Sequence, residues 1–277
     1  MKAVRFVNPE GETQIGALDD DGTITDAGAA GPQGFVPTTL AWDALRQADG
    51  PTYGVGDVRL LHPVVPGKLI GIGLNYRSHA EESQLDIPSV PVIFAKFSSS
   101  LIGPGAEIVI PREETRPDYE GELAVVIGQG VYRADADEAR AAVGGIAAIN
   151  DVSGRRAQLE TPLRQFTLGK SFDTFSPLGP CIAPADGVDL ADIDLRTTVS
   201  GEVMQDANTR DLIFSVVELI QYISAGATLE PGDVIATGTP SGVGDSRSPK
   251  RYLRQGDTVD IYIEGVGTLS NPVRNER

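Results

Sequence analysis

The sequence predicts a mixed α+β fold that is mostly β. Short segments rich in aliphatic and β-branched residues are separated by glycine turns, and they outnumber the segments with helical periodicity. Of the 277 residues, 40% are hydrophobic and 22% are charged, which are ordinary values for a globular protein and argue against disorder. This length allows one large domain with a smaller one attached to it.

Residues 1–65 are predicted to form a small β-rich domain. Its predicted strands are residues 3–7, 14–18 and 23–25. Asp21 and Gly22 precede the third of these strands, and an Asp-Gly pair between strands is typical of a hairpin turn. Prolines and glycines are frequent over residues 51–68, as in linkers between domains. We therefore expect a boundary near residue 65 and a second domain over residues 66–277.

The second domain is predicted to contain strands and helices in irregular alternation. Its predicted strands are residues 68–73, 90–94, 107–110, 120–127, 146–150, 233–237 and 258–263. Its predicted helices are residues 78–83, 135–143 and 209–225. The longest of these helices has apolar residues at helical spacing and is followed by Gly226, which is a common stop for a helix.

Composition excludes several classes of partner and compartment. The formal net charge is −16, and a surface of this kind repels nucleic acid and anionic lipid, so neither is expected as a partner. We find neither a continuous apolar stretch of about 18 residues nor the apolar region of a signal peptide, so no membrane association is expected. Cys181 is the single cysteine and cannot form an internal disulfide, which fits a cytoplasmic protein.

Glu120 and Glu122 begin a strand whose next five residues are apolar. Side chains at i and i+2 of a strand share a face, so both carboxylates point the same way, with Cα atoms about 6–7 Å apart. Two buried carboxylates repel each other, and desolvation costs several kcal/mol for each ion. Two cationic side chains, shared protons or a divalent metal ion could offset this cost. The alternative is an exposed strand end.

Asp151 supplies a third carboxylate and favours the metal ion. It follows the predicted strand 146–150, which is connected to the strand of the two glutamates by one short helical crossover, and strands connected in this way are commonly neighbours. Three carboxylates with open positions suit Mg²⁺ or Mn²⁺, and Ca²⁺ is also possible. The sequence contains no cluster of cysteine and histidine that would indicate zinc.

His79 is a candidate general base. It lies in a short predicted helix, and Glu82 follows one helical turn later, where its carboxylate can orient the imidazole and raise its basicity. Such a pair can activate a water molecule. The alternative is an ordinary surface histidine. The other histidine, His62, lies in the linker and is expected to have a structural role.

Further polar groups could complete a site. Lys170 lies among small and apolar residues, where its ammonium either serves the site or reaches solvent beyond its apolar stem. Arg155 and Gln158 follow Asp151 closely and could contact a substrate oxygen. The glycine-rich segment 238–244 follows a predicted strand, and its backbone N–H groups could bind an oxyanion or a carboxylate. This segment matches neither the Walker pattern nor the dinucleotide fingerprint.

Taken together, these segments resemble the fumarylacetoacetate hydrolase family. Each segment is weakly specific alone, but they follow the family's order from about residue 66 to the C-terminus. The matching segments are GLNYRSHAEE at residues 73–82, YEGEL at 119–123, NDVS at 150–153, GKSFD at 169–173 and GTPSGVG at 238–244. The first 65 residues fit the small, variable N-terminal domain of this family.

The resemblance implies a mixed β-roll catalytic domain that is usually dimeric, so we expect a homodimer. It assigns water activation to His79 with Glu82, and contacts to the substrate and its oxyanion to Lys170. It implies three ligands for Mg²⁺ or Mn²⁺: Glu120, Glu122 and Asp151. It also implies four further residues in contact with substrate: Tyr76, Arg155, Gln158 and Thr239.

The function that we predict is metal-dependent hydrolysis of a carbon–carbon bond in a β-diketo acid such as an acylpyruvate. The expected substrate is thus a small anionic keto acid, and residues 79–89 are expected to act as a lid. The same site could instead decarboxylate oxaloacetate, or isomerise or decarboxylate a hydroxymuconate-like diacid. A non-enzyme alternative is an inactive metal-binding paralogue. Ser153 and Gly154 replace a Thr-Ala pair of the family, which leaves the substrate preference open.

Overall fold

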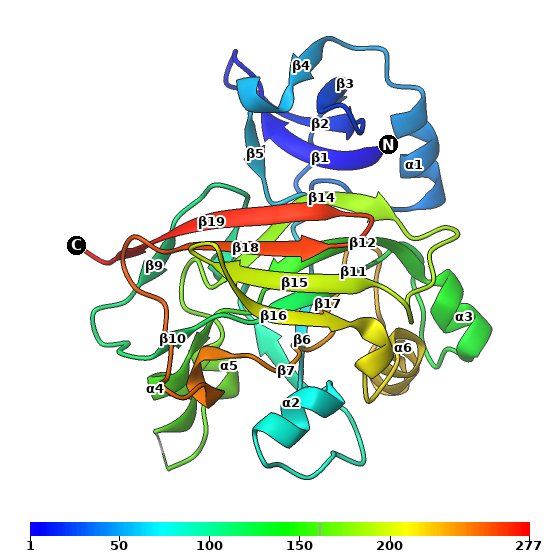
Figure 1. The fold of residues 1–277 in the computed structure, drawn as a ribbon. Helices are drawn as coiled ribbons and strands as arrows, with labels where there is room; N and C mark the ends of the chain where they lie inside the picture. Colours follow the sequence, from blue (N-terminus) through cyan, green and yellow to red (C-terminus); the bar gives the residue numbers. More distant parts are fainter. Residues whose placement is uncertain (161) are drawn as a thin grey trace.

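The computed structural model describes residues 1–160 and 162–277. Within these residues, strands predominate over helices, and the helices are short (Figure 1). The predicted mixed, mostly β fold is therefore confirmed.

The N-terminal residues form a small β-rich unit that stands beside the main body (Figure 1). Its elements are β1 (Lys2–Val7), β2 (Thr13–Leu18), β3 (Thr23–Ala29), α1 (Thr39–Arg46), β4 (Thr52–Gly54) and β5 (Arg59–Leu61). Gly22 has a φ of 86° in the turn before β3, a conformation that glycine adopts readily. Trp42 donates its indole N–H to the Gly144 carbonyl at 2.9 Å, which ties the unit to the body. The domain boundary near residue 65 remains a prediction.

The main sheet runs through both parts of the chain in the order β4-β3-β2-β1-β14-β12-β11-β17-β6-β7. The strands of the body in this sheet are β6 (Leu69–Gly73), β7 (Val92–Lys96), β8 (Leu101–Ile102, paired with β14), β11 (Gly121–Ile127), β12 (Val143–Asn150), β14 (Ser176–Pro184) and β17 (Val234–Ala236). The strand predicted at residues 90–94 is β7 and is shifted by two residues. The predicted neighbours β11 and β12 pair antiparallel, with Gly121 opposite Asn150.

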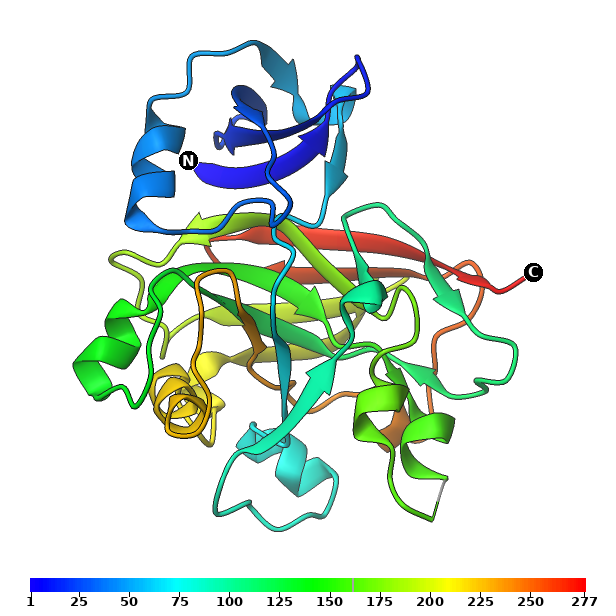
Figure 2. The same cartoon turned by 180° about the vertical axis from the view of Figure 1, so that it is seen from behind.

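A second sheet packs against the main sheet through β15, β18 and β19 (Figures 1 and 2). Its strands, in spatial order, are β16 (Glu202–Asn208), β15 (Asp194–Val199), β18 (Thr258–Ile263), β19 (Gly267–Asn275) and β9 (Ile108–Ile110). A two-stranded ladder joins β10 (Pro117–Asp118) to β13 (Ser153–Gly154).

The remaining helices are α2 (Arg77–Glu82), α3 (Ala136–Ala141), α4 (Arg155–Leu159), α5 (Phe166–Gly169) and α6 (Val216–Ser224). Among the described residues, 3₁₀ turns span Val55–Asp57, Ser98–Ser100, Thr209–Asp211 and Gly244–Ser246. The helix predicted over residues 209–225 begins only at Val216. Ser215 and Glu218 form a capping box there, and the Asn75 side chain binds the backbone of Phe214 just before it.

Strand β11 is buried along its whole length. Leu123, Val125 and Ile127 contact one hydrophobic cluster, whereas Ala124 and Val126 contact the other. Both faces are therefore covered, which explains why this strand is apolar without alternation. Figures 1 and 2 both show α2, α4 and α5 gathered at the end of the body opposite the N-terminal unit, the end at which β11 begins.

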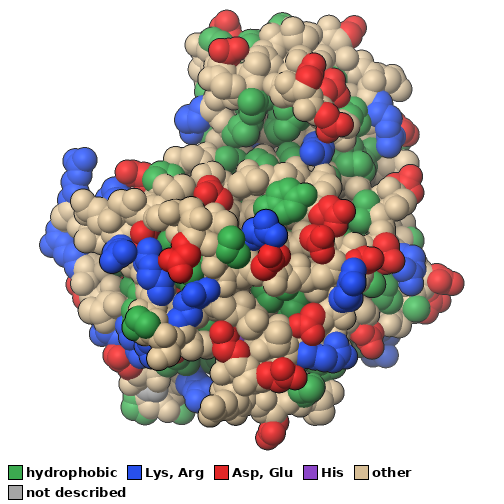
Figure 3. Space-filling model, viewed as in Figure 1, with side chains coloured by type: hydrophobic (Ala, Val, Ile, Leu, Met, Phe, Trp, Pro, Cys, Tyr) green, Lys and Arg blue, Asp and Glu red, His purple; other side chains and the backbone are tan. Residues whose placement is uncertain are grey.

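The outer face of the second sheet is polar. In Figure 3, acidic and basic side chains are interspersed over this face, and Arg196 on β15 pairs with Asp206 on β16 at 2.9 Å. Both side chains of that pair are more than half exposed. A search of the described residues for a helix with the length and apolarity of a membrane span found none.

Candidate active site

Three carboxylates converge where β11 begins and β12 ends. One oxygen each of Glu120, Glu122 and Asp151 lies within 4.8 Å of the others, and the three residues are at most 5% exposed. The backbone fixes this arrangement, because the Asp151 N–H donates to the Glu120 carbonyl at 2.8 Å. The Glu120 N–H donates to the side chain of Asn150 at 3.1 Å. The structure thus brings together the three predicted metal ligands.

Two lysines contact this cluster, and they use their donors differently. Lys170 donates to Glu120 at 2.5 Å and to Asp151 at 2.6 Å, and it lines a cavity beside the cluster. An ammonium has three N–H donors, so one of those on Lys170 has no acceptor among the described residues. Lys96 donates to Asp151 at 2.5 Å and to two main-chain carbonyls, those of Lys170 and Phe175. All of its donors are used, so Lys96 has a structural role.

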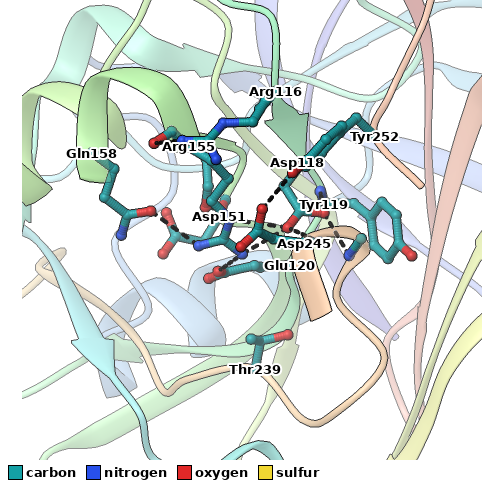
Figure 4. A network of polar contacts seen from close by, with 12 residues as sticks. Arg116, Asp118, Tyr119, Glu120, Asp151, Arg155, Gln158, Thr239, Asp245 and Tyr252 are labelled. Carbon is teal, nitrogen blue, oxygen red and sulfur yellow. Dashed lines mark hydrogen bonds and ion pairs between the residues drawn. The ribbon is translucent and has the colours of Figure 1, made fainter. Parts of the chain in front are cut away.

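The Arg155 guanidinium is held between protein side chains (Figure 4). Its Nε donates to Asp118 at 2.9 Å, one terminal nitrogen donates to Glu120 at 2.6 Å, and the other donates to Gln158 at 3.0 Å. The bond from Arg155 identifies the accepting oxygen of the Gln158 amide, and the amide NH₂ has no acceptor among the described residues. Arg155 therefore orients Glu120, while Gln158 keeps two donors for a ligand in the cavity that it lines.

The charges of this cluster nearly balance. With Asp118, which Arg155 joins to the cluster, the carboxylates are Asp118, Glu120, Glu122 and Asp151, and the cations are Lys96, Arg155 and Lys170. Burial alone would raise the pKa of Glu120, but Lys170 and Arg155 lower it to about 2. Burial and the charges of Asp151 and Glu120 raise the pKa of Glu122 well above its usual value. Burial alone would lower the pKa of Lys170, but the negative charges of Asp151 and Glu120 have the larger effect and raise it.

The donor set fits a hard divalent cation. Glu122 makes no ion pair with a lysine or arginine of the described chain, and one of its oxygens accepts from the Gly238 N–H at 2.7 Å. An added positive charge next to Glu122 would offset the repulsion from the other two carboxylates. The converging ligands are all oxygens, which suit Mg²⁺, Mn²⁺ or Ca²⁺. Glu120, Glu122 and Asp151 would hold the ion.

His79 and Glu82 face each other on α2. The Nδ1 atom of His79 lies 3.5 Å from Glu82 Oε2, which is longer than a hydrogen bond but within the distance of an ion pair. Glu82 in turn accepts from the Gly242 N–H, with both oxygens 3.0 Å away. Catalytic hydrogen bonds are often long in the absence of a ligand, so this distance agrees with a dyad that tightens on binding.

The glycine-rich segment 238–244 binds carboxylates of the protein itself. The N–H groups of Gly238, Gly242 and Gly244 donate to Glu122, Glu82 and Asp118, respectively. Gly242 has a φ of 103°, and a Cβ there would lie 2.0 Å from the Met204 carbonyl oxygen, so no other residue fits without rearrangement. These three N–H groups are therefore not available to a ligand, whereas the N–H of Thr239 has no acceptor among the described residues.

Part of this site borders a cavity of about 650 Å³, whereas Glu122 and Asp151 are not among the residues that line it. Its polar lining includes His79, Glu82, Glu120, Arg155, Lys170 and Thr239, and its apolar lining includes Leu85, Phe94, Leu159 and Phe166. A cavity with a few convergent polar groups on an apolar wall is typical of a site for a small molecule.

Tyr76, predicted to contact substrate, is fully buried and does not line this cavity. Its hydroxyl has no hydrogen-bond partner among the described residues. Burial and the nearby charges of Glu122 and Asp211 raise its pKa. A contact between Tyr76 and substrate remains a prediction.

Two groups of the site were not anticipated from the sequence. Asp118 precedes Glu120 by two residues. The same strand spacing that places Glu120 and Glu122 on one face could therefore have indicated that Asp118 also faces the site. Lys96 follows Phe94 by two residues in β7, and both side chains face the site. The predicted strand ended at Phe94, which left Lys96 outside it.

The fold and the site define a mostly β protein with a buried carboxylate cluster beside a small-molecule cavity. Residues 68–274 match the family model described as fumarylacetoacetate (FAA) hydrolase C-terminal. The chain therefore belongs to the fumarylacetoacetate hydrolase family, as the sequence motifs indicated.

Similar proteins within this family have different named activities. A 2,4-didehydro-3-deoxy-L-rhamnonate hydrolase of Sphingomonas sp. is 41% identical, and the match covers 100% of this chain and 97% of that protein. A mitochondrial oxaloacetate tautomerase of Homo sapiens is also 41% identical, over 87% of this chain and 77% of that protein. The solved structure of a 5-carboxymethyl-2-hydroxymuconate delta-isomerase from Mycobacterium smegmatis is 36% identical, with a TM-score of 0.83 and complete coverage of both chains.

Proposed function

We propose that this protein is a divalent-metal-dependent hydrolase that cleaves a carbon–carbon bond in a β-diketo acid of the acylpyruvate type. The observation that carries this proposal is the position of the His79–Glu82 pair on the same cavity as Lys170 and Glu120, a member of the carboxylate cluster. Hydrolysis needs a base for the attacking water and positive charge for the leaving enolate, and this cavity offers both.

The proposed reaction consumes one water molecule. The water oxygen bonds to the remote carbonyl carbon, and the bond from that carbon to the adjacent methylene breaks. The electron pair of the broken bond remains on the methylene carbon as the enolate of pyruvate, which then takes up a proton. The products are pyruvate and the carboxylic acid derived from the acyl group.

Residues of the chain would bind the substrate and move the proton. His79, oriented by Glu82, would take the proton of the attacking water. The third N–H of Lys170, the NH₂ of Gln158 and the main-chain N–H of Thr239 would donate to substrate oxygens. A divalent ion held by Glu120, Glu122 and Asp151 would supply Lewis acidity that stabilises the enolate charge.

The test is turnover of a panel of acylpyruvates by purified protein with Mg²⁺ or Mn²⁺. Hydrolysis predicts equimolar pyruvate and carboxylic acid, both of which are measured by chromatography. Absence of turnover across the panel, with an intact fold and bound metal, would contradict the proposal. It would favour the alternative of an inactive metal-binding paralogue.

A second candidate is isomerisation, tautomerisation or decarboxylation of a related keto acid at the same site. The named tautomerase and isomerase among the similar proteins favour it. Proton transfer by His79 could serve such a reaction without attack by water. Product analysis separates the candidates, because hydrolysis gives two organic fragments, decarboxylation gives CO₂, and isomerisation leaves the mass unchanged.

We also propose a cytoplasmic homodimer. Exposed apolar side chains on and near the edge strand β7 support the dimer: Val92 is 42% exposed, Ile93 43% and Phe97 50%. Light scattering during size-exclusion chromatography measures the mass, and a monomer at micromolar concentration would contradict this expectation.

We propose a domain boundary near residue 65 and a lid at residues 79–89. Limited proteolysis is expected to cut at both places, and bound ligand is expected to protect the lid.

A further inference from the structure

The peptide groups around Gly121 are held by side chains in place of a neighbouring strand. Pairing of β11 with β17 ends at Ala124, opposite Ala236. Further toward the site, the Gly121 N–H donates to the side chain of Gln205 at 3.0 Å, and the Gly121 carbonyl accepts from the Thr239 hydroxyl at 3.1 Å. Gly121 separates the two glutamates of the carboxylate cluster, so these bonds fix the backbone from which both carboxylates project.

The amide of Gln205 has one possible orientation. Its oxygen must face the Gly121 N–H, which is only a donor, and its nitrogen must face the Pro240 carbonyl at 3.0 Å, which is only an acceptor. The same nitrogen donates to the Thr239 hydroxyl at 2.7 Å. The three partners of Gln205 thus determine which end of its amide is the oxygen and which is the nitrogen.

This orientation also fixes the hydroxyl proton of Thr239. Because the hydroxyl accepts from Gln205, its own proton points to the Gly121 carbonyl, which can only accept. Thr239 lines the cavity, and its hydroxyl proton is not available to a ligand there. A carboxylate ligand would bind the N–H, since the hydroxyl proton is already used.

Gln205 reaches this position from the second sheet. It lies on β16 and is 1% exposed. A Cβ at Gly121 would lie 1.9 Å from the Thr197 hydroxyl oxygen and 3.4 Å from the oxygen of Gln205, so glycine is what allows the second sheet to come this close.

We propose that Gln205 is a positioning residue that fixes both the peptide between the two glutamate ligands and the orientation of Thr239. This inference rests on the proposed metal site. Gln205 touches neither the carboxylates nor the cavity, and it acts through Gly121 and Thr239.

The experiment compares Mn²⁺ binding by calorimetry in the full-length parent, Gln205→Met, Thr239→Val, Thr239→Ser and the double variant Gln205→Met/Thr239→Val. The matched control is Asn271→Leu. Asn271 is a buried amide of the same sheet that donates to two main-chain carbonyls at 2.9 Å, away from the site. Near-ultraviolet circular dichroism verifies the fold of each variant.

We expect Gln205→Met and Thr239→Val each to raise the Mn²⁺ Kd by about tenfold, which is the lower end for residues that orient metal ligands. In the double variant, the factor by which the Mn²⁺ Kd rises should be smaller than the product of the two single factors, because one hydrogen-bond network connects the residues. Thr239→Ser keeps the hydroxyl and should stay within about twofold of the parent, as should Asn271→Leu.

This inference is overturned if Gln205→Met keeps an Mn²⁺ Kd within about twofold of the parent. It is also overturned if Gln205→Met and Asn271→Leu raise the Mn²⁺ Kd by the same factor. If Gln205→Met does not fold, equal Kd values for Thr239→Val and the parent overturn it. A parent that binds no Mn²⁺ overturns this inference and the proposed function together. A parent that binds Mn²⁺ but converts no keto acid overturns the proposed function alone.

Discussion

Replacing Lys96 with methionine removes a buried cation while nearly preserving the shape of the side chain. The Lys96 ammonium is fully buried and donates to Asp151 at 2.5 Å, to the Phe175 carbonyl at 3.1 Å and to the Lys170 carbonyl. Without it, the Lys170 carbonyl loses the donor that Lys96 supplies, the Phe175 carbonyl keeps the Val152 N–H, and Asp151 keeps only Lys170 as a cationic partner. The substitution therefore tests whether Lys96 stabilises the carboxylate cluster.

The magnitude follows from these contacts. Removing one partner of a buried ion pair costs about 3–5 kcal/mol. Burial lowers the pKa of Lys96 despite the attraction of Asp151, so the desolvation cost of the ammonium is large and part of it is recovered on substitution. We therefore expect the free energy of unfolding to fall by about 3 kcal/mol, the lower end of this range.

The measurement is equilibrium unfolding in guanidinium chloride with a metal chelator present, followed by far-ultraviolet circular dichroism. The control is Arg196→Met, which breaks the exposed pair with Asp206 and should change the free energy of unfolding by less than about 1 kcal/mol. A loss below about 1 kcal/mol for Lys96→Met would refute the assignment of Lys96 as a structural cation.

Three further predictions concern metal, catalysis and pH. Glu122→Gln should weaken Mn²⁺ binding at least about tenfold in calorimetry, because it removes a ligand charge; unchanged affinity would mean that Glu122 is no ligand. His79→Ala should lower kcat for hydrolysis by about 10²–10⁴-fold and leave the Mn²⁺ Kd unchanged; parallel loss of both would indicate a structural role. Burial raises the pKa of the Cys181 thiol to about 12, above about 8.5 in the unfolded chain. Between these values only the unfolded state loses the proton, so stability falls as pH rises. The free energy of unfolding should fall between about pH 8 and pH 10, and it should fall less in Cys181→Ala than in the parent. An equal fall in the two proteins would contradict the raised pKa of Cys181.

Local periodicity predicted the centre of the site. The period of two placed Glu120 and Glu122 on one face, and the short crossover placed Asp151 beside them, as the pairing of β11 with β12 confirms. These relations depend on residues close in sequence or on adjacent strands, so the pattern of the chain is sufficient to reveal them.

Strand β14 illustrates what the pattern could not reveal. Its nine residues include Pro177, Gly179, Pro180 and Pro184, which are typical of turns and not of strands. It is nevertheless a buried strand of the main sheet, between β1 and β12, because tertiary packing outweighs local propensity. The helix predicted from residue 209 was wrong at its start for a related reason, since the side chain of Asn75 holds the backbone before Ser215.

The supporting residues of the site are the hardest to predict. Gln205 reaches Gly121 across 84 positions of sequence, and it is neither charged nor part of a periodic pattern that marks the cavity. Arg155 was expected to contact the substrate, which remains a prediction, and the sequence did not reveal that its guanidinium also binds three protein side chains. Contacts such as that of Gln205 with Gly121 depend on how the two sheets pack, and no local feature of the sequence predicts that packing.

The glycine-rich segment 238–244 has a consequence for how the site can change. Its N–H groups hold Glu82, the partner of the proposed base, the proposed metal ligand Glu122, and Asp118, which binds Arg155. One short piece of backbone therefore sets the spacing between the proposed base and the carboxylates that we propose to hold the metal ion. Substrate preference can diverge through the apolar side chains of the cavity without disturbing that spacing, whereas a single inserted residue in this segment would misalign both halves of the reaction at once.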